Sequence, residues 1–356
     1  MKTIFQGKRI ASILGILPET VANFDDEVGN YAFPPSQTMR LKRLMGFKQH
    51  RLAKENSTVS DFGVYGLQYM LKNNWIRKEE IGAVVVVTLC PDFFVPQVSN
   101  IIQGELKLTK DVICLDVAQG CCGFLVGLMQ SFMLLEHLGN KKVVLVNGDV
   151  LSHKISKRDR NDFPLAGDAT TVTIIENDPN AKAIYYEMNM DGSRADALKI
   201  PAGGFRMPSS DATAEMKDCG SGNFRSLNHM HMDGSGIFNF VQTDVADMLQ
   251  AAFENGSKNI DDIDYFFFHQ PNKFILQKLA EKVGIPPEKM FMNLVENFGN
   301  PSGASIPMTI IFNRAEELKT TQKNCCLAAF GSGLAWGLMF MDIGNLAFCE
   351  MIESNL

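Results

Sequence analysis

The chain has 356 residues, 46% of them hydrophobic and 21% charged, which is ample material for a large buried core. Its formal net charge is −6 and it has no run or stripe of Lys and Arg, so nucleic acid is not expected as a partner. The only apolar run near the start, Ile10 to Leu17, ends at Pro18, and no stretch approaches the roughly 18 apolar residues of a membrane span. We therefore expect neither a signal peptide nor a membrane anchor.

The eight cysteines are scattered and form no CxxC pair. His229 and His231 could share one face of a strand, but no further ligand lies near them in the sequence, so no metal site is expected. Several cysteines lie within apolar, strand-like runs: Cys90, Cys114, Cys325 and Cys326. Thiols that are buried in this way are typical of a reducing compartment and predict a cytoplasmic protein.

The first half of the chain alternates strands and helices. Apolar spacing predicts a helix over 58–73, and the β-branched run AVVVVTLC that follows is typical of a buried strand. From that run onward the pattern predicts strand, helix, strand, helix and strand, at 83–90, 98–106, 112–117, 121–138 and 142–150.

The second half repeats this pattern. A helix with apolar spacing is predicted over 237–255, and the strands and helices after it are predicted at 264–270, 273–283, 289–295, 302–318 and 325–333. Each half then has the order strand, helix, strand, glycine-rich turn, helix, strand. The approximate duplication predicts an α/β protein of two βαβαβ halves, with parallel-rich sheets covered by helices.

We place the boundary between the halves near residue 180, which gives an N-terminal half of 1–180 and a C-terminal half of 181–356. Residues 187–233 are rich in Gly, Ser, Asp and Met and show little periodicity. A stretch of that length inside a compact protein is usually functional or disordered. We expect it to form a cap over an active site.

Cys121 is the first candidate for chemistry. The sequence LDVAQGCCGFLVGL places this thiol where a strand ends, small residues turn and a long helix begins. A helix N-terminus stabilises a thiolate, which lowers its pKa, and offers N–H groups to an oxyanion. The alternative is a buried structural cysteine. Cys122 is the rival nucleophile, but successive helical side chains differ by about 100°, so only one of the two can face a site.

His269 and Asn300 are the other candidates. His269 follows three Phe residues at the end of a predicted strand, where α/β sheets gather ligand-binding groups, although it could equally be a buried structural histidine. Asn300 lies in the turn ENFGNPSGAS, where it could simply cap the next helix. In the duplication, however, Asn300 occupies the position that Cys121 has in the first half. Two equivalent turns that meet at a pseudo-twofold axis would bring the three residues together.

These motifs resemble those of the β-ketoacyl-acyl carrier protein synthase III family of the thiolase superfamily. DVAQGCCGF is similar to the nucleophile motif, with the family's Cys at Cys121; HQPN resembles HQxN; and FGNPSGASIP resembles GNxSxASxP. AFGSGLAWG, MDGSGIF and RLKRLMGFKQHRLA extend the resemblance over essentially the whole chain. It implies a thiolase-like fold in a layered α-β-α-β-α arrangement.

The resemblance also implies an activity, the decarboxylative condensation of an acyl thioester with malonyl-acyl carrier protein in fatty acid or related acyl-chain biosynthesis. Cys121 would carry the acyl group, and the N–H groups of Cys121 and Ser332 would hold its carbonyl oxygen. His269 and Asn300 would bind the thioester oxygen of the malonyl group while carbon dioxide leaves. The implied partners are acyl-coenzyme A, acyl carrier protein and a second copy of the chain. No cofactor is implied beyond the coenzyme A and phosphopantetheine thioesters that serve as substrates.

The substrate-binding positions that the resemblance implies are partly altered. The family stacks the coenzyme A adenine on a Trp, with an Arg one turn later, and here Arg40 and Leu44 stand at those places. The Arg on the other side of that clamp is kept as Arg160. The remaining implied substrate contacts are Gly234, Asn272 and Val95, the last in place of a Phe on the acyl-pocket wall.

The basic residues that dock the acidic carrier protein in the family are also altered. Two of them correspond to Asn239 and Phe274, which leaves Lys273, Lys278 and Lys282 nearby. Together with the altered adenine clamp, this favours a donor other than acetyl-coenzyme A, with a longer or branched acyl chain.

Two other functions are compatible with parts of this sequence. A condensing-fold acyltransferase that moves acyl groups onto an alcohol or amine would keep the same Cys121 but release no carbon dioxide. A non-catalytic partner subunit would typically lack the Cys or the His, and this chain has all three candidate residues.

Overall fold

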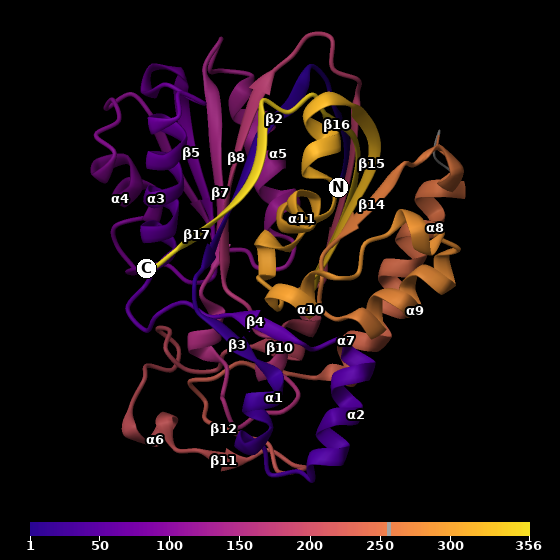
Figure 1. Ribbon diagram of the computed structural model, residues 1–356. Coiled ribbons are helices and arrows are strands. Elements are labelled where there is room, and N and C mark those ends of the chain that lie inside the picture. The colour runs from indigo at the N-terminus through magenta and orange to yellow at the C-terminus, as the bar shows by residue number, and fades with distance from the viewer. Residues whose placement is uncertain (255–257) are drawn as a thin grey trace.

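The computed structural model describes residues 1–254 and 258–356. Two mixed sheets form its centre (Figure 1). The first has the order β17-β2-β8-β7-β5-β6, with strands Phe348–Ser354, Lys8–Pro18, Ala169–Asn177, Lys142–Asp149, Ile81–Val87 and Ile113–Val117. The second has the order β1-β9-β16-β15-β14, with strands Lys2–Phe5, Ile184–Met190, Ala335–Gly344, Gln322–Gly331 and Tyr265–Phe268.

Helices form three layers around these sheets (Figure 1). Helices α3 (Val59–Lys72) and α4 (Val98–Glu105) cover the outer face of the first sheet, and α5 (Gly123–Leu135) and α11 (Ser305–Thr320) fill the space between the sheets. The outer face of the second sheet is covered by α7 (Gly234–Phe240), α8 (Ala246–Glu254) and α9 (Lys273–Val283). Each helix layer buries its apolar stripe against a sheet, so the predicted α-β-α-β-α arrangement is confirmed.

The two sheets exchange their terminal strands. β1 pairs antiparallel with β9 in the second sheet, while β17 pairs parallel with β2 in the first. The predicted boundary near residue 180 falls between β8 and β9, but the first strand of the chain belongs to the second sheet and the last strand to the first. The two halves are therefore interlocked.

One predicted strand is wrong. Residues 289–295 form only an isolated bridge between Met290 and Phe266, followed by α10 (Leu294–Phe298). The Gln270 side-chain amide donates to the carbonyl of Phe291 (2.9 Å), which takes up an acceptor that a strand would need for its ladder. The chain consequently turns away from the edge of β14.

Two predicted helices differ in detail. The helix predicted over 121–138 starts at Gly123 and ends at Leu135. The helix predicted over 237–255 contains a π-helical turn at Val241–Val245 between α7 and α8, and its predicted last residue, Asn255, lies outside the described residues. No described helix is long and apolar enough to cross a membrane.

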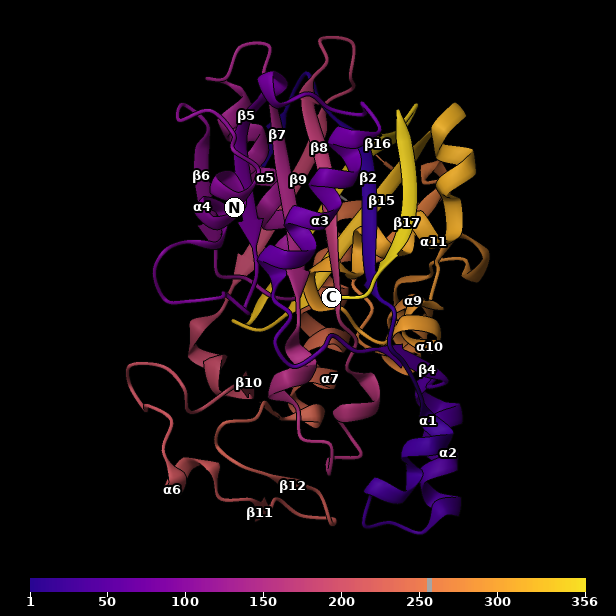
Figure 2. The ribbon, with the colours of Figure 1, turned by 60° about the vertical axis from the view of Figure 1, so that its left-hand side comes forward.

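A cap covers one end of the two sheets, drawn at the bottom of Figures 1 and 2. The segment predicted as an insertion, 187–233, begins as part of β9 and then becomes largely irregular. Residues 21–51 contribute the other part. The short elements of the cap are α1 (Phe24–Glu27), α2 (Pro35–Met45), β3 (Val21–Asn23), β4 (Gln49–Arg51), β10 (Leu198–Lys199), α6 (Asp211–Ala214), β11 (Lys217–Asp218), β12 (Phe224–Arg225) and β13 (His231–Met232).

Candidate active site

A cavity of about 610 Å³ lies between the cap and the ends of the sheets. Cys121, His269 and Asn300 all line it. Cys121 comes from the turn between β6 and α5, His269 directly follows β14, and Asn300 lies in the turn after α10. The three sequence-predicted candidates thus lie at one site, although they are up to 179 residues apart in the chain.

Only one of the two adjacent cysteines faces the cavity. Cys121 lines it next to Gly331, whereas Cys122 is fully buried in the core between the sheets, and its thiol donates to the carbonyl of Ala335 (3.3 Å). The side chain of Cys122 therefore packs away from any substrate in the cavity.

Burial raises the pKa of the Cys121 thiol to about 11. Backbone hydrogen bonds from Ser332 and from Cys121 itself act in the opposite direction, and the carboxylate of Asp149 adds to the increase. The expectation that the helix N-terminus lowers this pKa is therefore wrong in its net effect. Helix α5 begins only at Gly123, and the loss of hydration outweighs the stabilisation that its N-terminus provides.

His269 is only 1% exposed, and burial lowers its pKa to about 4. Its Nδ1 lies 2.7 Å from the hydroxyl of Ser305, its backbone N–H donates to Ala328, and its ring meets Phe330 edge-on. The imidazole is therefore neutral near pH 7. A neutral ring held by Ser305 can donate or accept one hydrogen bond in the cavity but carries no charge there.

Asn300 is fixed by two hydrogen bonds. Its backbone N–H donates to the carbonyl of Leu165 (2.7 Å), and its Oδ1 accepts the backbone N–H of Ser302 (2.9 Å). Because Oδ1 is engaged by the backbone, the side-chain NH₂ is the group left to bind a ligand in the cavity.

Asp149, at the end of β7, is a functional candidate that the sequence analysis missed. Its Oδ1 accepts hydrogen bonds from the backbone N–H of Leu89 (2.7 Å) and the hydroxyl of Thr88 (3.0 Å). Burial raises its pKa to about 6. The only signal in the sequence is a carboxylate that ends the apolar run KVVLVNGD.

The other predicted substrate contacts divide into two groups. Gly234 and Asn272 line the cavity, and Asn272 also caps α9 by accepting the backbone N–H of Ile275 (2.9 Å). Arg40, Arg160 and Val95 do not line it.

The structure shows why these three residues lie elsewhere. Helix α2 presents Leu41 and Met45 to the cavity, which leaves Arg40 exposed to solvent. The Arg160 guanidinium stacks 3.1 Å from the ring centre of Phe33, and Val95 lies on the surface, 82% exposed.

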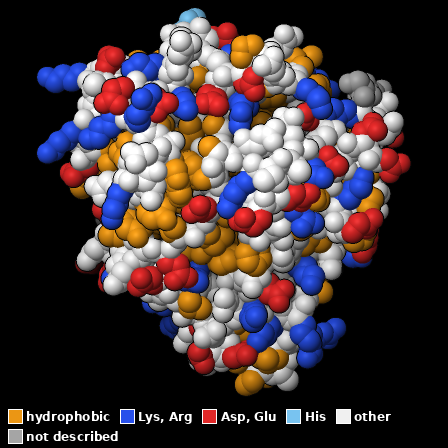
Figure 3. Space-filling view, turned by 45° about the horizontal axis from the view of Figure 1, so that its top comes forward, with side chains coloured by type: hydrophobic (Ala, Val, Ile, Leu, Met, Phe, Trp, Pro, Cys, Tyr) orange, Lys and Arg blue, Asp and Glu red, His pale blue; other side chains and the backbone are white. Residues whose placement is uncertain are grey.

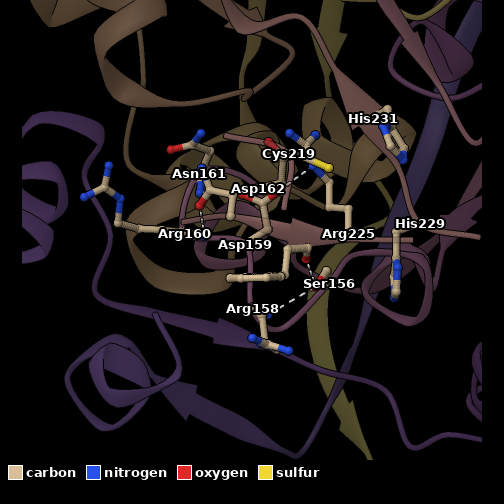
Figure 4. Close-up of polar contacts among 12 residues, drawn as sticks. Ser156, Arg158, Asp159, Arg160, Asn161, Asp162, Cys219, Arg225, His229 and His231 are labelled. Atoms are coloured by element: carbon tan, nitrogen blue, oxygen red, sulfur yellow. Dashed lines mark hydrogen bonds and ion pairs between the residues drawn. The ribbon is translucent and has the colours of Figure 1, made fainter. Parts of the chain in front are cut away.

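A polar stretch of the cavity wall was also missed. Asn161, Asp162 and Arg225 line the cavity, and in Figure 4 the two carboxylates Asp159 and Asp162 point toward Arg225 while Arg160 points away. Arg225 forms ion pairs with Asp159 (2.9 Å) and Asp162 (3.4 Å). Burial and the neighbouring Asp159 raise the pKa of Asp162 to about 7.

His229 and His231 both turn toward Ser226, at 2.8 Å from its hydroxyl and 3.0 Å from its carbonyl respectively. No cluster of three or more potential metal ligands occurs among the described residues.

Most of the remaining wall is apolar, which suits an acyl chain and the arm that carries it. The apolar side chains come from the cap, from α7 and α9 and from the strand ends: Leu41, Met45, Phe47, Leu89, Leu151, Ile155, Leu165, Leu198, Ile200, Met230, Met232, Ile237, Phe238, Phe274, Ile275 and Phe330.

Comparison with known proteins gives one consistent result. Residues 115–192 match the family model for 3-oxoacyl-[acyl-carrier-protein] synthase III, and residues 253–343 match the model for the C-terminal part of that enzyme. A Campylobacter jejuni protein with the provisional name 3-oxoacyl-[acyl-carrier-protein] synthase 3 is 30% identical, with 97% of each chain covered. The β-ketoacyl-[acyl-carrier-protein] synthase III of Natranaerobius thermophilus is also 30% identical, over 82% of this chain and 87% of that protein.

Solved structures agree with these matches. The crystal structure of a 3-oxoacyl-(acyl-carrier protein) synthase from Burkholderia xenovorans superposes with a TM-score of 0.91 and 29% identity, covering 99% of both chains.

Proposed function

This chain belongs to the 3-oxoacyl-[acyl-carrier-protein] synthase III family, and we propose that it condenses an acyl thioester with malonyl-acyl carrier protein in fatty acid or related acyl-chain biosynthesis. The reaction releases carbon dioxide and gives a 3-oxoacyl product. The observation that carries the proposal is the meeting of Cys121, His269 and Asn300 at one largely apolar cavity.

In the first half-reaction, the Cys121 sulfur attacks the carbonyl of the acyl donor and forms an acyl-cysteine. The oxyanion that develops is bound by the N–H groups of Cys121 and Ser332. Support comes from the backbone hydrogen bonds that these two residues make at the thiol. Donors fixed in place before the reaction stabilise the developing charge without reorganisation.

In the second half-reaction, His269 and Asn300 bind the thioester oxygen of the malonyl group. Carbon dioxide leaves, and negative charge accumulates on that oxygen as an enolate. The NH₂ group of Asn300 is free to donate because Oδ1 is engaged by Ser302. Ser305 Oγ accepts the backbone N–H of Gln270 (3.4 Å), so its own proton can go to His269 Nδ1, which leaves Nε2–H to donate to the enolate.

The carbanion equivalent then attacks the acyl group on Cys121, and the sulfur leaves as a thiolate that takes up a proton from solvent to regenerate the thiol. An acyltransferase that uses an alcohol or amine acceptor would share the first half-reaction only. The names of the relatives favour condensation, and carbon dioxide release distinguishes the two activities. We assign the enzyme to the acyltransferases on the basis of the acyl-Cys121 intermediate.

Gly234 and Asn272 are proposed contacts of the substrate arm because both line the cavity. Arg40 and Arg160 are proposed contacts of the outer part of coenzyme A, and Lys273, Lys278 and Lys282 of the carrier protein. No cofactor is proposed beyond these thioester substrates. The eight cysteines form no disulfide among the described residues, and we place the protein in the cytoplasm on this basis.

We also propose a homodimer. One face of the molecule gathers hydrophobic side chains at its surface (Figure 3). Phe94 and Phe205 are 71% and 89% exposed and contact each other with ring centres 5.1 Å apart. Val95, next to Phe94, is 82% exposed in the single chain. Exposed apolar groups of this size usually mark an interface. Light scattering should therefore give a mass of twice 39.5 kDa for the wild type. The variant Phe94→Asp should instead have the mass of a single chain.

The decisive experiment supplies malonyl-acyl carrier protein and a panel of acyl-coenzyme A donors to the purified protein. We expect an acyl adduct in the intact-protein mass spectrum without the malonyl substrate. With it, carbon dioxide and a 3-oxoacyl product should form in equal amounts. An adduct without carbon dioxide release would favour the acyltransferase instead.

A further inference from the structure

Two buried polar atoms next to Cys121 have no hydrogen-bond partner among the described residues. They are Ser302 Oγ and Asp149 Oδ2. Ser302 lines the cavity beside Cys121, and Asp149, 1% exposed, does not reach the cavity. Unpartnered buried polar atoms are uncommon in proteins because each forfeits its hydration, so two of them behind a reactive thiol call for an explanation.

Both groups are held firmly. One oxygen of Asp149 is bound by Thr88 and Leu89, which leaves only Oδ2 available to a further partner. Ser302 has a φ of +49°, in the left-handed region that residues other than Gly rarely adopt, and Asn300 Oδ1 binds its N–H there. This conformation places Ser302 Oγ close to Gly120, the residue before Cys121: a Cβ built on Gly120 would lie 3.2 Å from it.

The Ser302 hydroxyl lies near both the thiol and the carboxyl group. It lowers the pKa of Cys121 and also that of Asp149, so it lies near both, although neither contact has hydrogen-bonding geometry in the resting structure. The order of groups is therefore Cys121 Sγ, Ser302 Oγ and Asp149 Oδ2, leading from the cavity into the first sheet.

The thiol needs a proton acceptor. With a pKa of about 11, roughly one Cys121 in several thousand is a thiolate at pH 7.5. His269, with a pKa of about 4, is a weak base. Asp149 has a pKa of about 6, so it is mostly ionised at neutral pH and still close enough to neutrality to hold a proton briefly.

We propose that Ser302 and Asp149 relay the proton of Cys121 during acylation. As the sulfur bonds to the donor carbonyl, the thiol proton moves to Ser302 Oγ and the hydroxyl proton of Ser302 moves to Asp149 Oδ2. When the tetrahedral intermediate collapses and the bond from carbon to the donor sulfur breaks, the proton returns through Ser302 to the leaving thiolate. The products are acyl-Cys121 and a free thiol, with Ser302 and Asp149 unchanged.

In this scheme Ser302 is the catalytic group, since it touches the reacting sulfur, and Asp149 acts through it.

Other titratable groups also surround Asp149. The Cys90 thiol lies near Asp149 and the buried Asp168, and burial raises the pKa of Cys90 well above its ordinary value. Neither Cys90 nor Asp168 lines the cavity. The inference rests on the proposed function and specifies how its first half-reaction handles the proton.

Asp149→Asn gives a sharp test because two effects of the substitution have opposite signs. An Asn can still accept the hydrogen bonds of Leu89 and Thr88 through its Oδ1, so the fold should survive. Loss of the negative charge lowers the pKa of Cys121, so iodoacetamide should alkylate Cys121 faster at a given pH. Loss of the proton acceptor should slow acylation by an acyl-coenzyme A at least about tenfold. Peptide mass spectrometry restricts the alkylation readout to Cys121.

Ser302→Gly is the second variant, chosen because Gly adopts a positive φ freely. It should slow both alkylation and acylation. The Cys121 thiolate loses the hydroxyl that would donate to it, and the relay loses the group that passes the proton to Asp149. The double variant should acylate no more slowly than the slower single variant, as expected of residues that act as a unit. Asp168→Asn, a matched buried carboxyl, should change both rates by less than about threefold.

The wild-type protein provides a test that needs no variant. Its acylation rate should rise with pH through about 6, as Asp149 ionises, whereas alkylation should rise only toward about 11. In Asp149→Asn, the rise of the acylation rate near pH 6 should disappear. Parallel acceleration of alkylation and acylation in Asp149→Asn, or one common pH limb for both reactions in the wild type, would overturn the relay. The proposed function would survive that outcome as long as carbon dioxide and a 3-oxoacyl product still formed.

Discussion

Gly331 packs directly against Cys121: a Cβ atom built on Gly331 would lie 2.5 Å from both the Cβ and the sulfur of Cys121. Real Cβ atoms do not approach other atoms this closely, so one of the two residues would have to move. The strand end that carries Gly331 and Ser332 therefore fixes the position of the thiol from the side of the second sheet.

Gly331→Ala is accordingly expected to displace Cys121 or Ser332 and to lower the rate of acylation by at least about 10²-fold, because a displacement of 1 Å at a reacting centre has effects of that size. The rate of adduct formation in intact-protein mass spectra measures it. Gly104→Ala in α4 is the control, since a Cβ there meets no atom within 4 Å. Equal acylation by both variants would contradict the close packing.

Cys121, and not Cys122, is expected to carry the acyl group. Cys121→Ala should abolish the adduct, whereas Cys122→Ala should retain it, because Cys122 is buried in the core and bonded to Ala335. Removing that sulfur leaves a small cavity, so Cys122→Ala should also unfold at a slightly lower temperature. An adduct that maps to Cys122 would refute the assignment.

His269→Ala and Asn300→Ala should impair condensation more than acylation. The enolate oxygen that these residues bind forms only after Cys121 has been loaded. Loss of one preorganised donor typically lowers a rate by about 10²–10³-fold. Single-turnover experiments that separate adduct formation from carbon dioxide release measure the two steps. A variant that fails to load but condenses normally once loaded would reverse the proposed roles.

Much of the framework was predictable because its signals are local. Helix α9 begins and ends at the predicted residues, 273 and 283, since Asn272 caps its start and Gly284 takes a left-handed φ of +82° at its end. The three candidate residues could be found because each ends a strand or lies in a glycine-rich turn, and such places converge at one edge of the sheets.

The missed features depend on contacts between distant segments. Whether 289–295 continues as a strand depends on the Gln270 side chain, and the role of Asp149 depends on a serine 153 positions later in the chain. The pKa of Cys121 was misjudged for a related reason. A helix N-terminus is visible in the sequence, but the burial that opposes it arises only when cap and sheets are assembled.

The buried carboxyl group of Asp162 in the cavity wall predicts a pH effect on stability. Asp162 has a folded-state pKa of about 7, above its ordinary value of 3.8, so between these values the folded state binds more protons than the unfolded state. The contribution of Asp162 to stability therefore falls as pH rises from about 4 to 7. The melting temperature of Asp162→Asn, measured relative to that of the wild type, should increase as the pH is raised from 5 to 8. The same difference for the exposed control Asp211→Asn should not change. A difference in melting temperature that stays constant with pH would contradict the raised pKa.

The last prediction concerns the acyl donor. The cavity has a volume of about 610 Å³ and mostly apolar walls, so it can hold far more than an acetyl group. Arg40 is exposed on α2 and Leu44 beside it is apolar, so neither offers the flat indole face that stacks an adenine in the family. We therefore expect medium-chain acyl donors to exceed acetyl-coenzyme A in kcat/KM.

Delivery on a carrier protein adds a second expectation. Lys278 is paired with Glu281, and Lys282 binds the carbonyl of Gln242, so Lys273 is the least engaged of the three lysines among the described residues. Charge contacts act mainly on encounter rates and weaken with salt. Lys273→Glu should thus lower kcat/KM for acyl-carrier donors at low salt and leave short acyl-pantetheine donors unaffected, with Lys289→Glu, on the 3₁₀ turn after α9, as a control for added charge. A clear preference for acetyl-coenzyme A would mean that the altered clamp is compensated elsewhere and that the enzyme starts chains from acetyl units.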